Sequence, residues 1–412
     1  MSFVHLFHPT RIVRQTIPLP GSKSESNRAL VLNRLCGGKL QINNLSNALD
    51  TQRLLQILNS NDLTIDVADT GTSMRFLTAM YAVLNEHKII TGTARMQERP
   101  ISELVNALND IGFDVRYTEQ EGYPPVEIIP IQNLHHLKNE VHIAGHVSSQ
   151  FISALLLIAP FLPNGLTIHF TTPLRSRPYA EMTVQLLQRI GADASIGKDY
   201  CYAKNLPQME PQEIQIGADW SSASYWYSIA FLAQEAEITF LNLRDDWSQG
   251  DCIVSEWMHR FGIETTFTEQ GAAIKKRQVK LPEMMKYNFA DNPDLVQTFA
   301  VMLGAANICT TFSGLESLRL KETDRIAALH NELKKFNLHF DYSEMYDFHQ
   351  VRGQFQPSSD VVKTYHDHRM AMAFAPLAII NPINIENPGV VAKSYPAFWE
   401  HLISAGFELR FG

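Results

Sequence analysis

The stretch "GSKSESNRALVLN", residues 21–33, has a form that recurs along the chain: small, polar or charged residues lead directly into an apolar helical stretch. Because the starts recur roughly every 73 residues after a shorter first interval, the pattern is an internal repeat. It predicts six helices that begin in the same way. The other copies are residues 69–81, 148–160, 221–233, 292–304 and 367–379.

A second series of segments alternates with the first and is amphipathic. Each member runs into a turn and then an alternating strand, and residues 51–65 form a looser sixth member. The turn falls where a helix C-terminus needs a residue in the left-handed conformation. The residues at that turn are Gly112, Gly191, Gly262, Gly406 and, in one segment, Asn337. Together the two series predict an α/β protein built from modules of about 70 residues.

Six modules exceed what a single hydrophobic core normally holds. We therefore expect two halves of three modules each, with a boundary near residues 211–222. The active site is expected between the halves.

Composition excludes several classes of protein. The 412-residue chain has a formal net charge of −8 and a pI near 6.0, which lacks the basic footprint of a nucleic-acid binder. Its four cysteines are far apart, without a CxxC pair or a histidine at metal-ligand spacing, so neither a disulfide framework nor a zinc site is predicted. No apolar run approaches about 18 residues and no signal segment is present. We expect a cytoplasmic protein without a membrane or nucleic-acid partner.

Charged and hydroxyl side chains gather at the starts of the first-series helices. Unpaired backbone N–H groups and the helix dipole favour an anion there. Lys23 and Arg28 add positive charge at the first start, and Gly71 lets the backbone approach a ligand closely at the second. A capped helix with solvated cations is the alternative for any one stretch, but the recurrence favours anion binding. The polar donors at these starts are Ser22, Ser24, Ser26, Thr72, Ser73, Ser148, Ser149 and Gln150.

Several arginines are also candidates for anion binding. Arg99 and Arg177 each precede a proline, which predicts extended turns rather than helices at both. In "KETDR", Lys321 and Arg325 are four residues apart and would share a helix face. Two like charges on one face are unfavourable unless something negative lies above them, although the carboxylates inside the motif could neutralise them.

Candidate acids and bases lie among these cations. Asp294 leads into a helix whose dipole favours an ionised carboxylate, and such a carboxylate among cations is a candidate general base. Glu322 and His368 are candidate acids, and Arg369 and Lys393 add further positive charge. From the residues alone we infer a cleft between the halves that binds at least two anionic groups without a metal. This predicts transfer chemistry on phosphorylated small molecules.

Eight motifs, in this order, resemble those of the 3-phosphoshikimate 1-carboxyvinyltransferase (EPSP synthase) family: "PGSKSESNRAL", "TGTSMRF", "ERPI", "SSQF", "SRPY", "KETDR", "DHRMAM" and "VAKSYP". The resemblance runs essentially end to end. It implies the enolpyruvyl transferase fold, an inverse β-prism: two globular domains of three βαβαββ modules each, joined by two chain crossings, with the active site in the interdomain cleft. We expect one domain at 16–216 and a second formed by 1–15 and 217–412.

The resemblance also implies a reaction. The enolpyruvyl group of phosphoenolpyruvate is transferred to the 5-hydroxyl of shikimate 3-phosphate, and phosphate leaves through a tetrahedral intermediate. Asp294 is implied as the base that takes the hydroxyl proton and Glu322 as the group that handles protons at the enol methylene carbon, with Lys23 and His368 as further catalytic candidates. The implied shikimate 3-phosphate ligands are Lys23, Ser24, Arg28, Ser148, Ser149, Gln150, Ser176, Asp294, Ser317 and Lys321. The implied phosphoenolpyruvate ligands are Lys23, Gly71, Arg99, Gln150, Arg325, Arg369 and Lys393.

Two positions depart from the family pattern. Asp69 stands where many members carry asparagine, which places a negative charge near phosphoenolpyruvate, and Ser317 stands where asparagine is frequent in the phosphate site. Gly71 resembles the glycine of herbicide-sensitive members, which implies inhibition by glyphosate in competition with phosphoenolpyruvate.

Three alternatives are weaker. The sister family that acts on UDP-N-acetylglucosamine uses a cysteine shortly before an Arg-Pro, and "GTARMQERPI" has none. A non-catalytic sugar-phosphate-binding paralogue is disfavoured because Lys23, Asp294, Glu322 and Arg369 are all retained. RNA-processing enzymes with related modules share only the fold. We expect a monomer that uses no cofactor and no metal.

Overall fold

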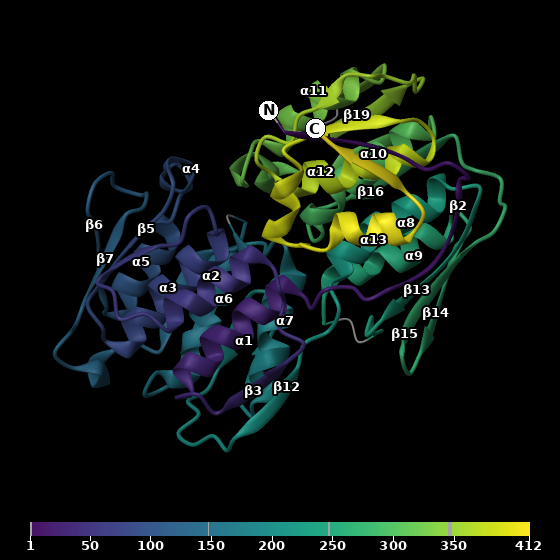
Figure 1. Cartoon of the computed structure of the whole chain (residues 1–412). Coiled ribbons are helices and arrows are strands. Elements are labelled where there is room, and N and C mark those ends of the chain that lie inside the picture. Colours follow the sequence, from purple (N-terminus) through teal and green to yellow (C-terminus); the bar gives the residue numbers. More distant parts are fainter. Residues whose placement is uncertain (1, 147, 246–247, 345–347) are drawn as a thin grey trace. The chain divides into compact units, whose positions relative to one another are not determined.

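The computed structural model describes residues 2–146, 148–245, 248–344 and 348–412. The chain divides into two compact units, which Figure 1 shows with their elements labelled. The N-terminal unit consists of Ser22–Ser46 and Asp50–Ile216. The C-terminal unit consists of Met1–Gly21, Asn47–Leu49 and Gly217–Gly412.

Both units are built from a βαβαββ module, which is clearest at residues 64–129. Its first two strands are parallel, so a helix must cross over between them, and its last two strands form a hairpin that adds antiparallel to the second strand. The strand order is therefore first, second, fourth, third. The elements are β4 (Thr64–Asp66), α3 (Gly71–Leu84), β5 (Lys88–Thr91), α4 (Ala94–Gln97), α5 (Ser102–Ile111), β6 (Asp114–Tyr117) and β7 (Val126–Ile129).

Two further modules repeat this strand order within one continuous stretch of chain. In the N-terminal unit the elements are β8 (Glu140–Ala144), α6 (Ser149–Ile158), β9 (Leu166–Thr172), α7 (Arg177–Arg189), β10 (Ala194–Ile196) and β11 (Tyr200–Ala203). In the C-terminal unit they are β16 (Met284–Asn288), α10 (Val296–Ala305), β17 (Cys309–Ser313), α11 (Arg325–Lys334), β18 (Leu338–Ser343) and β19 (Phe348–Gly353).

The modules at the two chain crossings exchange their first strands. β2 leads along the chain into α1 but pairs with β13, whereas β12 leads into α8 but pairs with β3. At the first crossing β2 belongs to the C-terminal unit and α1 to the N-terminal unit. At the second crossing β12 belongs to the N-terminal unit and α8 to the C-terminal unit. The elements are β2 (Ile12–Ile17), α1 (Lys23–Leu35), β3 (Leu40–Asn43), α2 (Leu49–Leu58) and β12 (Gln212–Gln215), then α8 (Trp220–Leu232), β13 (Glu235–Leu241), α9 (Ile253–His259), β14 (Ile263–Thr268) and β15 (Gly271–Lys276).

The N-terminal strand completes the last module. β1 lies antiparallel between β21 and β22, in the place of the fourth strand. The elements are β1 (Phe3–Phe7), β20 (Val361–Val362), α12 (His368–Phe374), β21 (Ile383–Glu386), α13 (Phe398–Ser404) and β22 (Glu408–Phe411). The predicted α/β fold of related modules is confirmed.

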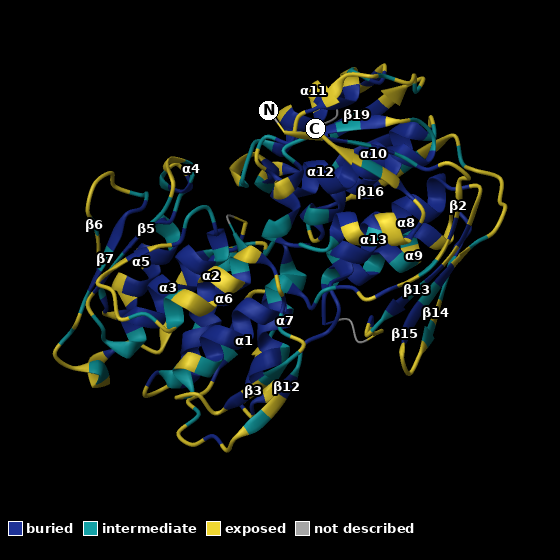
Figure 2. Ribbon diagram, in the orientation of Figure 1, coloured by how far each residue is buried: buried dark blue, intermediate teal, exposed yellow. Residues whose placement is uncertain are grey.

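The first helices of the modules form the interior of each unit. α1, α3 and α6 pack against one another in the N-terminal unit, and α8, α10 and α12 do so in the C-terminal unit. α10 is buried along its whole length and α8 at all but one position, as the dark blue ribbons of Figure 2 show. A helix that is apolar on all sides needs neighbours on all sides, which explains the first-series sequences. No helix in the described ranges is long and apolar enough to span a membrane.

The predicted helix ends of the second series are confirmed. The five residues at these turns have φ between 59° and 118°, the left-handed region. Glycine adopts this conformation without a steric cost, and asparagine tolerates it. These residues are Gly112, Gly191, Gly262, Gly406 and Asn337.

Candidate functional site

The starts of α1 and α3 are joined in the N-terminal unit through one carboxylate. Lys23 Nζ donates to Asp50 Oδ2 at 2.8 Å, and Thr70 Oγ1, at the N-cap of α3, donates to Asp50 Oδ1 at 3.2 Å. Asn27 Nδ2 on α1 donates to Thr72 Oγ1 at 3.1 Å. The side chains of Lys23 and Asp50 are 16% and 17% exposed, so this ion pair is largely buried.

Arg99 lies against the first residue of α3. Its Nη1 donates to the backbone carbonyl of Asp69 at 3.2 Å, and a Cβ built on Gly71 would lie only 2.5 Å from Arg99 Nη2. Glycine therefore leaves the room that this guanidinium occupies. Arg75, one turn into α3, donates to the carbonyl of Pro100 at 2.8 Å and fastens the chain beside Arg99.

Arg28 is buried among neutral oxygen atoms. It donates to Thr183 Oγ1 at 2.7 Å, to Ser153 Oγ at 2.9 Å and to the carbonyls of Ser24 and Tyr179. Burial lowers the pKa of Arg28 to about 10. In this structure Arg28 ties α1 to α6 and α7 and orients the backbone of Ser24.

Two of the predicted serines lie directly before helices. Ser148 caps α6 by accepting a hydrogen bond from the backbone N–H of Gln150 at 3.3 Å. Ser176 precedes α7 with a φ of 51°, a conformation that is unfavourable for a residue with a Cβ. Ser149 opens α6 and is buried.

The prediction of an extended turn at Arg177 is wrong, because Arg177 is the first residue of α7. A proline in the first helical turn is tolerated since the N–H that it lacks would have no intrahelical partner there. Arg177 donates to Glu181 Oε1 at 2.7 Å and to the carbonyls of Ile196 and Gly197 at the end of β10, so it fastens the helix within its own module.

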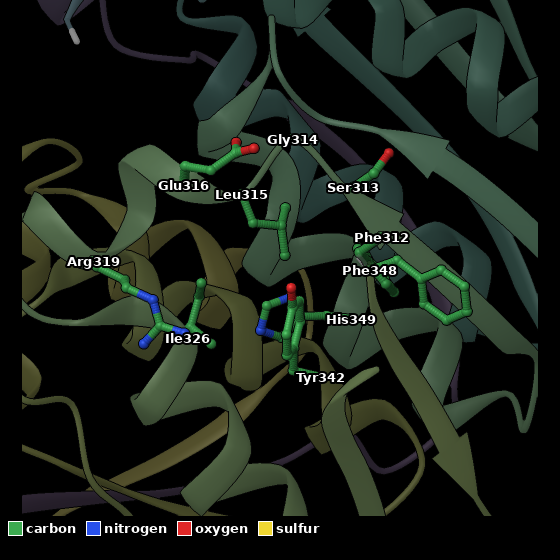
Figure 3. Close-up of a pocket in the computed structure, with 10 residues that line it drawn as sticks. All are labelled: Phe312, Ser313, Gly314, Leu315, Glu316, Arg319, Ile326, Tyr342, Phe348 and His349. Atoms are coloured by element: carbon green, nitrogen blue, oxygen red, sulfur yellow. The ribbon is translucent and has the colours of Figure 1, made fainter. Parts of the chain in front are cut away.

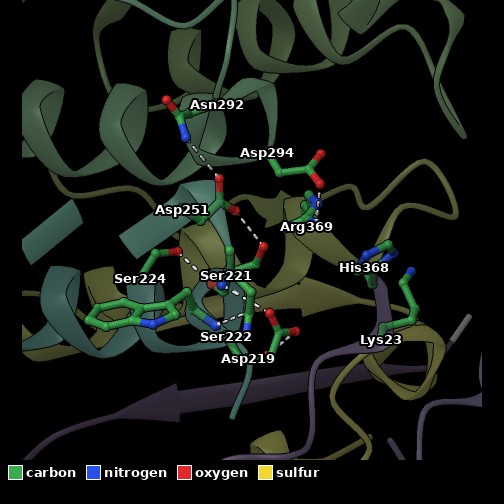
Figure 4. Close-up of polar contacts among 12 residues, drawn as sticks. Lys23, Asp219, Ser221, Ser222, Ser224, Asp251, Asn292, Asp294, His368 and Arg369 are labelled. Carbon is green, nitrogen blue, oxygen red and sulfur yellow. Dashed lines mark hydrogen bonds and ion pairs between the residues drawn. The ribbon is translucent and has the colours of Figure 1, made fainter. Parts of the chain in front are cut away.

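In the C-terminal unit Asp294 lies between two arginines, one of which is shown in Figure 4. Asp294 Oδ1 accepts from Arg325 Nη1 at 3.0 Å, and Oδ2 accepts from Arg369 Nη2 at 2.6 Å. Asp294 belongs to the 3₁₀ turn Pro293–Leu295 before α10, Arg325 opens α11, and Arg369 lies in the first turn of α12. Arg369 also donates to Tyr225 Oη on α8 at 3.3 Å.

Arg325 binds three carboxylates although its side chain is only 1% exposed. Besides Asp294, it donates from Nε to Asp367 Oδ2 at 2.7 Å and from Nη2 to Glu322 Oε2 at 3.0 Å. Burial alone would lower the pKa of Arg325, but the charges of Asp367, Glu322 and Asp294 outweigh it and raise that pKa. The guanidinium is therefore permanently charged.

The prediction that Lys321 and Arg325 share a helix face is wrong. α11 begins only at Arg325, because Asp324 caps it by accepting from two backbone N–H groups of its first turn, each at 3.1 Å. Lys321 follows the 3₁₀ segment Glu316–Leu320 in an extended conformation. The motif is thus a turn between two helical segments, closed by the ion pair of Glu322 with Arg325.

The remaining predicted residues of this unit lie on neighbouring elements. His368 opens α12, buried, with its Nδ1 3.7 Å from Asp367 Oδ1. Lys393 ends a 3₁₀ segment and donates to the carbonyl of His366 at 3.0 Å. Ser317 lies within the segment Glu316–Leu320. The structure thus brings Asp294, Glu322, Arg325 and Arg369 into one ion-paired group and places the others around it.

Three residues of these groups were not predicted. Asp50, directly before the loose amphipathic segment 51–65, pairs with a lysine 27 positions away, and Tyr225 lies inside an apolar helix. Asp251 is buried and accepts from Ser221 Oγ at 2.5 Å. Burial, followed by the charge of Asp294, raises the pKa of Asp251 to about 6. The sequence around these single carboxylates and hydroxyls matches no motif. For Asp251, the one feature that could have predicted a functional role is its position immediately before an apolar stretch.

A separate hollow, open to solvent, lies in the C-terminal unit (Figure 3). None of the described residues that line it is a predicted site residue. Its wall is mostly apolar, with Glu316 and Arg319 as charged members, and Arg319 forms an exposed ion pair with Asp324 at 3.2 Å. The lining residues are Phe312, Ser313, Gly314, Leu315, Glu316, Arg319, Ile326, Tyr342, Phe348 and His349.

The ion-paired groups can bind anions and move protons. An incoming phosphate or carboxylate competes with Asp294 for two guanidinium groups, which bind such groups in a bidentate manner. Asp294, once partly released, can accept a proton from a bound hydroxyl. Among the described residues, no three side chains of His, Cys, Asp or Glu are grouped as a metal site would require.

Comparison with known proteins gives consistent matches along the chain. A family model described as EPSP synthase (3-phosphoshikimate 1-carboxyvinyltransferase) matches residues 56–402. A 3-phosphoshikimate 1-carboxyvinyltransferase of Bacteroides fragilis is 43% identical over 408 residues, 97% of each chain. One of Haemophilus influenzae is 31% identical over 430 residues, covering 95% of this chain and 96% of that protein.

Solved structures of low sequence identity share the fold. The structure of an EPSP synthase from Acinetobacter baumannii superimposes with a TM-score of 0.77 at 20% identity, covering all of both chains. The enolpyruvyl transferase NikO from Streptomyces tendae gives a TM-score of 0.76 at 14% identity, covering 100% of this chain and 99% of that one.

Proposed function

Because the chain belongs to the EPSP synthase (3-phosphoshikimate 1-carboxyvinyltransferase) family, we propose that it transfers the enolpyruvyl group of phosphoenolpyruvate to the 5-hydroxyl of shikimate 3-phosphate. The hydroxyl oxygen bonds to the phosphate-bearing enol carbon while the methylene carbon gains a proton. Phosphate then leaves the tetrahedral intermediate as the methylene carbon loses a proton. The product, 5-enolpyruvylshikimate 3-phosphate, lies on the route to chorismate and the aromatic amino acids.

The observation that carries this proposal is the position of Asp294 between Arg325 and Arg369. Both proposed substrates are anions, and the two guanidinium groups offer them a rigid binding surface. Arg325 is held by Asp367 and Glu322, and Arg369 by the Tyr225 hydroxyl. The positive charge of the two guanidinium groups favours the ionised form of Asp294. Bound substrate anions then share these guanidinium groups with Asp294. The hold of the guanidinium groups on Asp294 weakens in this way, and Asp294 can accept the hydroxyl proton.

The individual roles follow the family motifs. We assign the proton transfers to Asp294, Glu322, Lys23 and His368. We assign phosphoenolpyruvate binding to Lys23, Gly71, Arg99, Gln150, Arg325, Arg369 and Lys393. We assign shikimate 3-phosphate binding to Lys23, Ser24, Arg28, Ser148, Ser149, Gln150, Ser176, Asp294, Ser317 and Lys321. Since Arg28 binds the carbonyl of Ser24, its contribution includes the orientation of that serine.

Phosphate release tests the function directly. The purified protein in EDTA is expected to release inorganic phosphate from phosphoenolpyruvate only when shikimate 3-phosphate is also present, with a new enolpyruvyl product by mass spectrometry. Folded protein that releases no phosphate would contradict the proposal. UDP-N-acetylglucosamine is the acceptor to try next in that case, since turnover with it would assign the sister activity.

Gly71→Ala should impair the use of phosphoenolpyruvate. The new methyl would lie 2.5 Å from Arg99 Nη2, so the guanidinium must move. Because displacing a substrate-positioning group by about 1 Å can cost up to about 100-fold, we expect kcat/KM for phosphoenolpyruvate to fall about 10- to 100-fold. Steady-state kinetics with varied phosphoenolpyruvate would measure this. The unmodified protein is expected to be inhibited by glyphosate in competition with phosphoenolpyruvate, and the variant less so.

Gly389→Ala is the matched control, because a Cβ there would meet no atom closer than 3.9 Å. It should leave both kinetics and inhibition unchanged. A Gly71→Ala protein with unaltered kcat/KM would show that Arg99 does not position phosphoenolpyruvate.

We propose, as finer points, a monomer that acts in the cytoplasm without a nucleic-acid or membrane partner. In the described part of the chain, no disulfide joins any of the four cysteines. Light scattering of the purified protein would test the monomer.

A further inference from the structure

Asp251 is a buried carboxylate beside the turn that carries Asp294, and the proposed mechanism gives it no role. It lies in the 3₁₀ turn Gly250–Cys252. Figure 4 shows its two contacts: its Oδ2 accepts from Ser221 Oγ at 2.5 Å, and its Oδ1 accepts from Asn292 Nδ2 at 3.4 Å. A buried carboxylate is costly unless it is hydrogen-bonded or serves an electrostatic purpose.

Asn292 connects this carboxylate to the Asp294 turn. Asn292 is the N-cap residue of Pro293–Leu295, and its backbone carbonyl accepts from the N–H of Leu295 at 3.1 Å. Its Nδ2 also donates to the carbonyl of Gly250 at 2.8 Å. One amide group therefore fastens the turn of Asp294 to the turn of Asp251 at two points.

We propose that Asp251 is a positioning residue for Asp294: through Asn292 it holds the Pro293–Leu295 turn, and its negative charge opposes the two arginines and preserves the basicity of Asp294. Two cations at hydrogen-bond distance favour an ionised carboxylate and so weaken it as a proton acceptor. A second carboxylate nearby has the opposite effect: its negative charge disfavours the ionised form of Asp294 and so strengthens it as a proton acceptor. This inference rests on the proposed function, in which Asp294 is the base.

The charges that face Asp251 define the expected pH dependence. Burial raises its pKa first, and the charges of Asp294 and of Asp219 at the start of α8 raise it further, whereas the Ser221 hydrogen bond and Arg369 lower it. The result is a pKa of about 6. Asp251 is therefore ionised above about pH 6 and protonated below it. We expect kcat to fall as the pH drops through this range.

Two substitutions give opposite signatures in a kcat profile from pH 5 to 8. Ser221→Ala removes a hydrogen bond to the ionised form, so the pKa of Asp251 rises and the acid limb should move to higher pH. Asp251→Asn removes the titrating group, so that limb should disappear while kcat at pH 8 falls about tenfold, a moderate loss of general-base efficiency. The double variant should behave like Asp251→Asn.

Two more variants separate charge from geometry. Asn292→Ala keeps the carboxylate but removes the tether, so it should lower kcat and retain an acid limb. Asp219→Asn removes a neighbouring negative charge, which lowers the pKa of Asp251, so the limb should stay or move slightly to lower pH. Circular dichroism would confirm folding, and if Asp251→Asn does not fold, Ser221→Ala and Asn292→Ala still decide the question.

The outcomes separate this inference from the proposed function. Absence of phosphate release by the unmodified protein would overturn both. An active unmodified protein whose Ser221→Ala and Asp251→Asn variants keep its acid limb would overturn the role of Asp251 alone, and leave Asp251 as a structural residue.

Discussion

Asp294→Asn is expected to lower kcat about 100- to 10,000-fold, the usual contribution of a general base. An amide cannot take the hydroxyl proton, and it can accept from only one of the two arginines that now bind both oxygens of Asp294. KM should change far less than kcat, because the proton transfer takes place in the transition state. Phosphate release with both substrates at saturation would measure the loss.

Asp291→Asn provides the control for this variant. Asp291 is exposed and only three positions before Asp294, so it tests the effect of removing one negative charge from the same segment. It should keep kcat within about twofold, since the charge of an exposed side chain is largely screened by solvent. An Asp294→Asn protein that keeps more than a tenth of its kcat would show that another group takes the proton.

Arg325→Met is expected to cost about 3–5 kcal/mol in the free energy of unfolding, because it leaves buried carboxylates without their cation. Asp367 is the most affected: it is fully buried and receives hydrogen bonds from both Arg325 and the backbone N–H of Arg369. Denaturant titration followed by circular dichroism at pH 7 would measure the loss.

Arg319→Met is the matched control for Arg325→Met. Arg319 also binds a carboxylate, Asp324, but its side chain is 56% exposed. An exposed pair contributes at most about 1 kcal/mol, so this variant should lose less than that. If the two variants lost the same free energy of unfolding, burial would not explain the cost of removing Arg325.

The fold was largely predictable because its signals are local. The left-handed residues at the second-series helix ends were predicted, since this conformation is set by one residue and its neighbours. The strand exchange was not predictable in the same way. Ile12 pairs with Glu235, and Gln212 pairs with Leu40, and no periodicity within one segment indicates a partner so far away along the chain.

The candidate site was predictable in its residue types but not in their partners. "KETDR" signalled a cation-rich turn, yet the shared helix face of Lys321 and Arg325 was wrong because the Asp324 cap starts the helix later. Arg28 was predicted as an anion ligand, and its partners on α6 and α7 lie 125 and 155 positions away. The motif contains the capping residue Asp324 but does not show that the helix begins after it, and the burial of one arginine depends on groups outside the motif.

By itself, the sequence determined the number of modules, the turns at which their second-series helices end and the family to which the chain belongs. These properties follow from apolar periodicity, turn residues and short motifs, each contained within a few turns of chain. The tertiary structure decided which charges meet: Lys23 with Asp50, Asp294 with two arginines, and Asp251 with Asn292. The reason is that an ionic interaction depends on distance and burial, and both are set by the packing of distant segments rather than by their order in the chain.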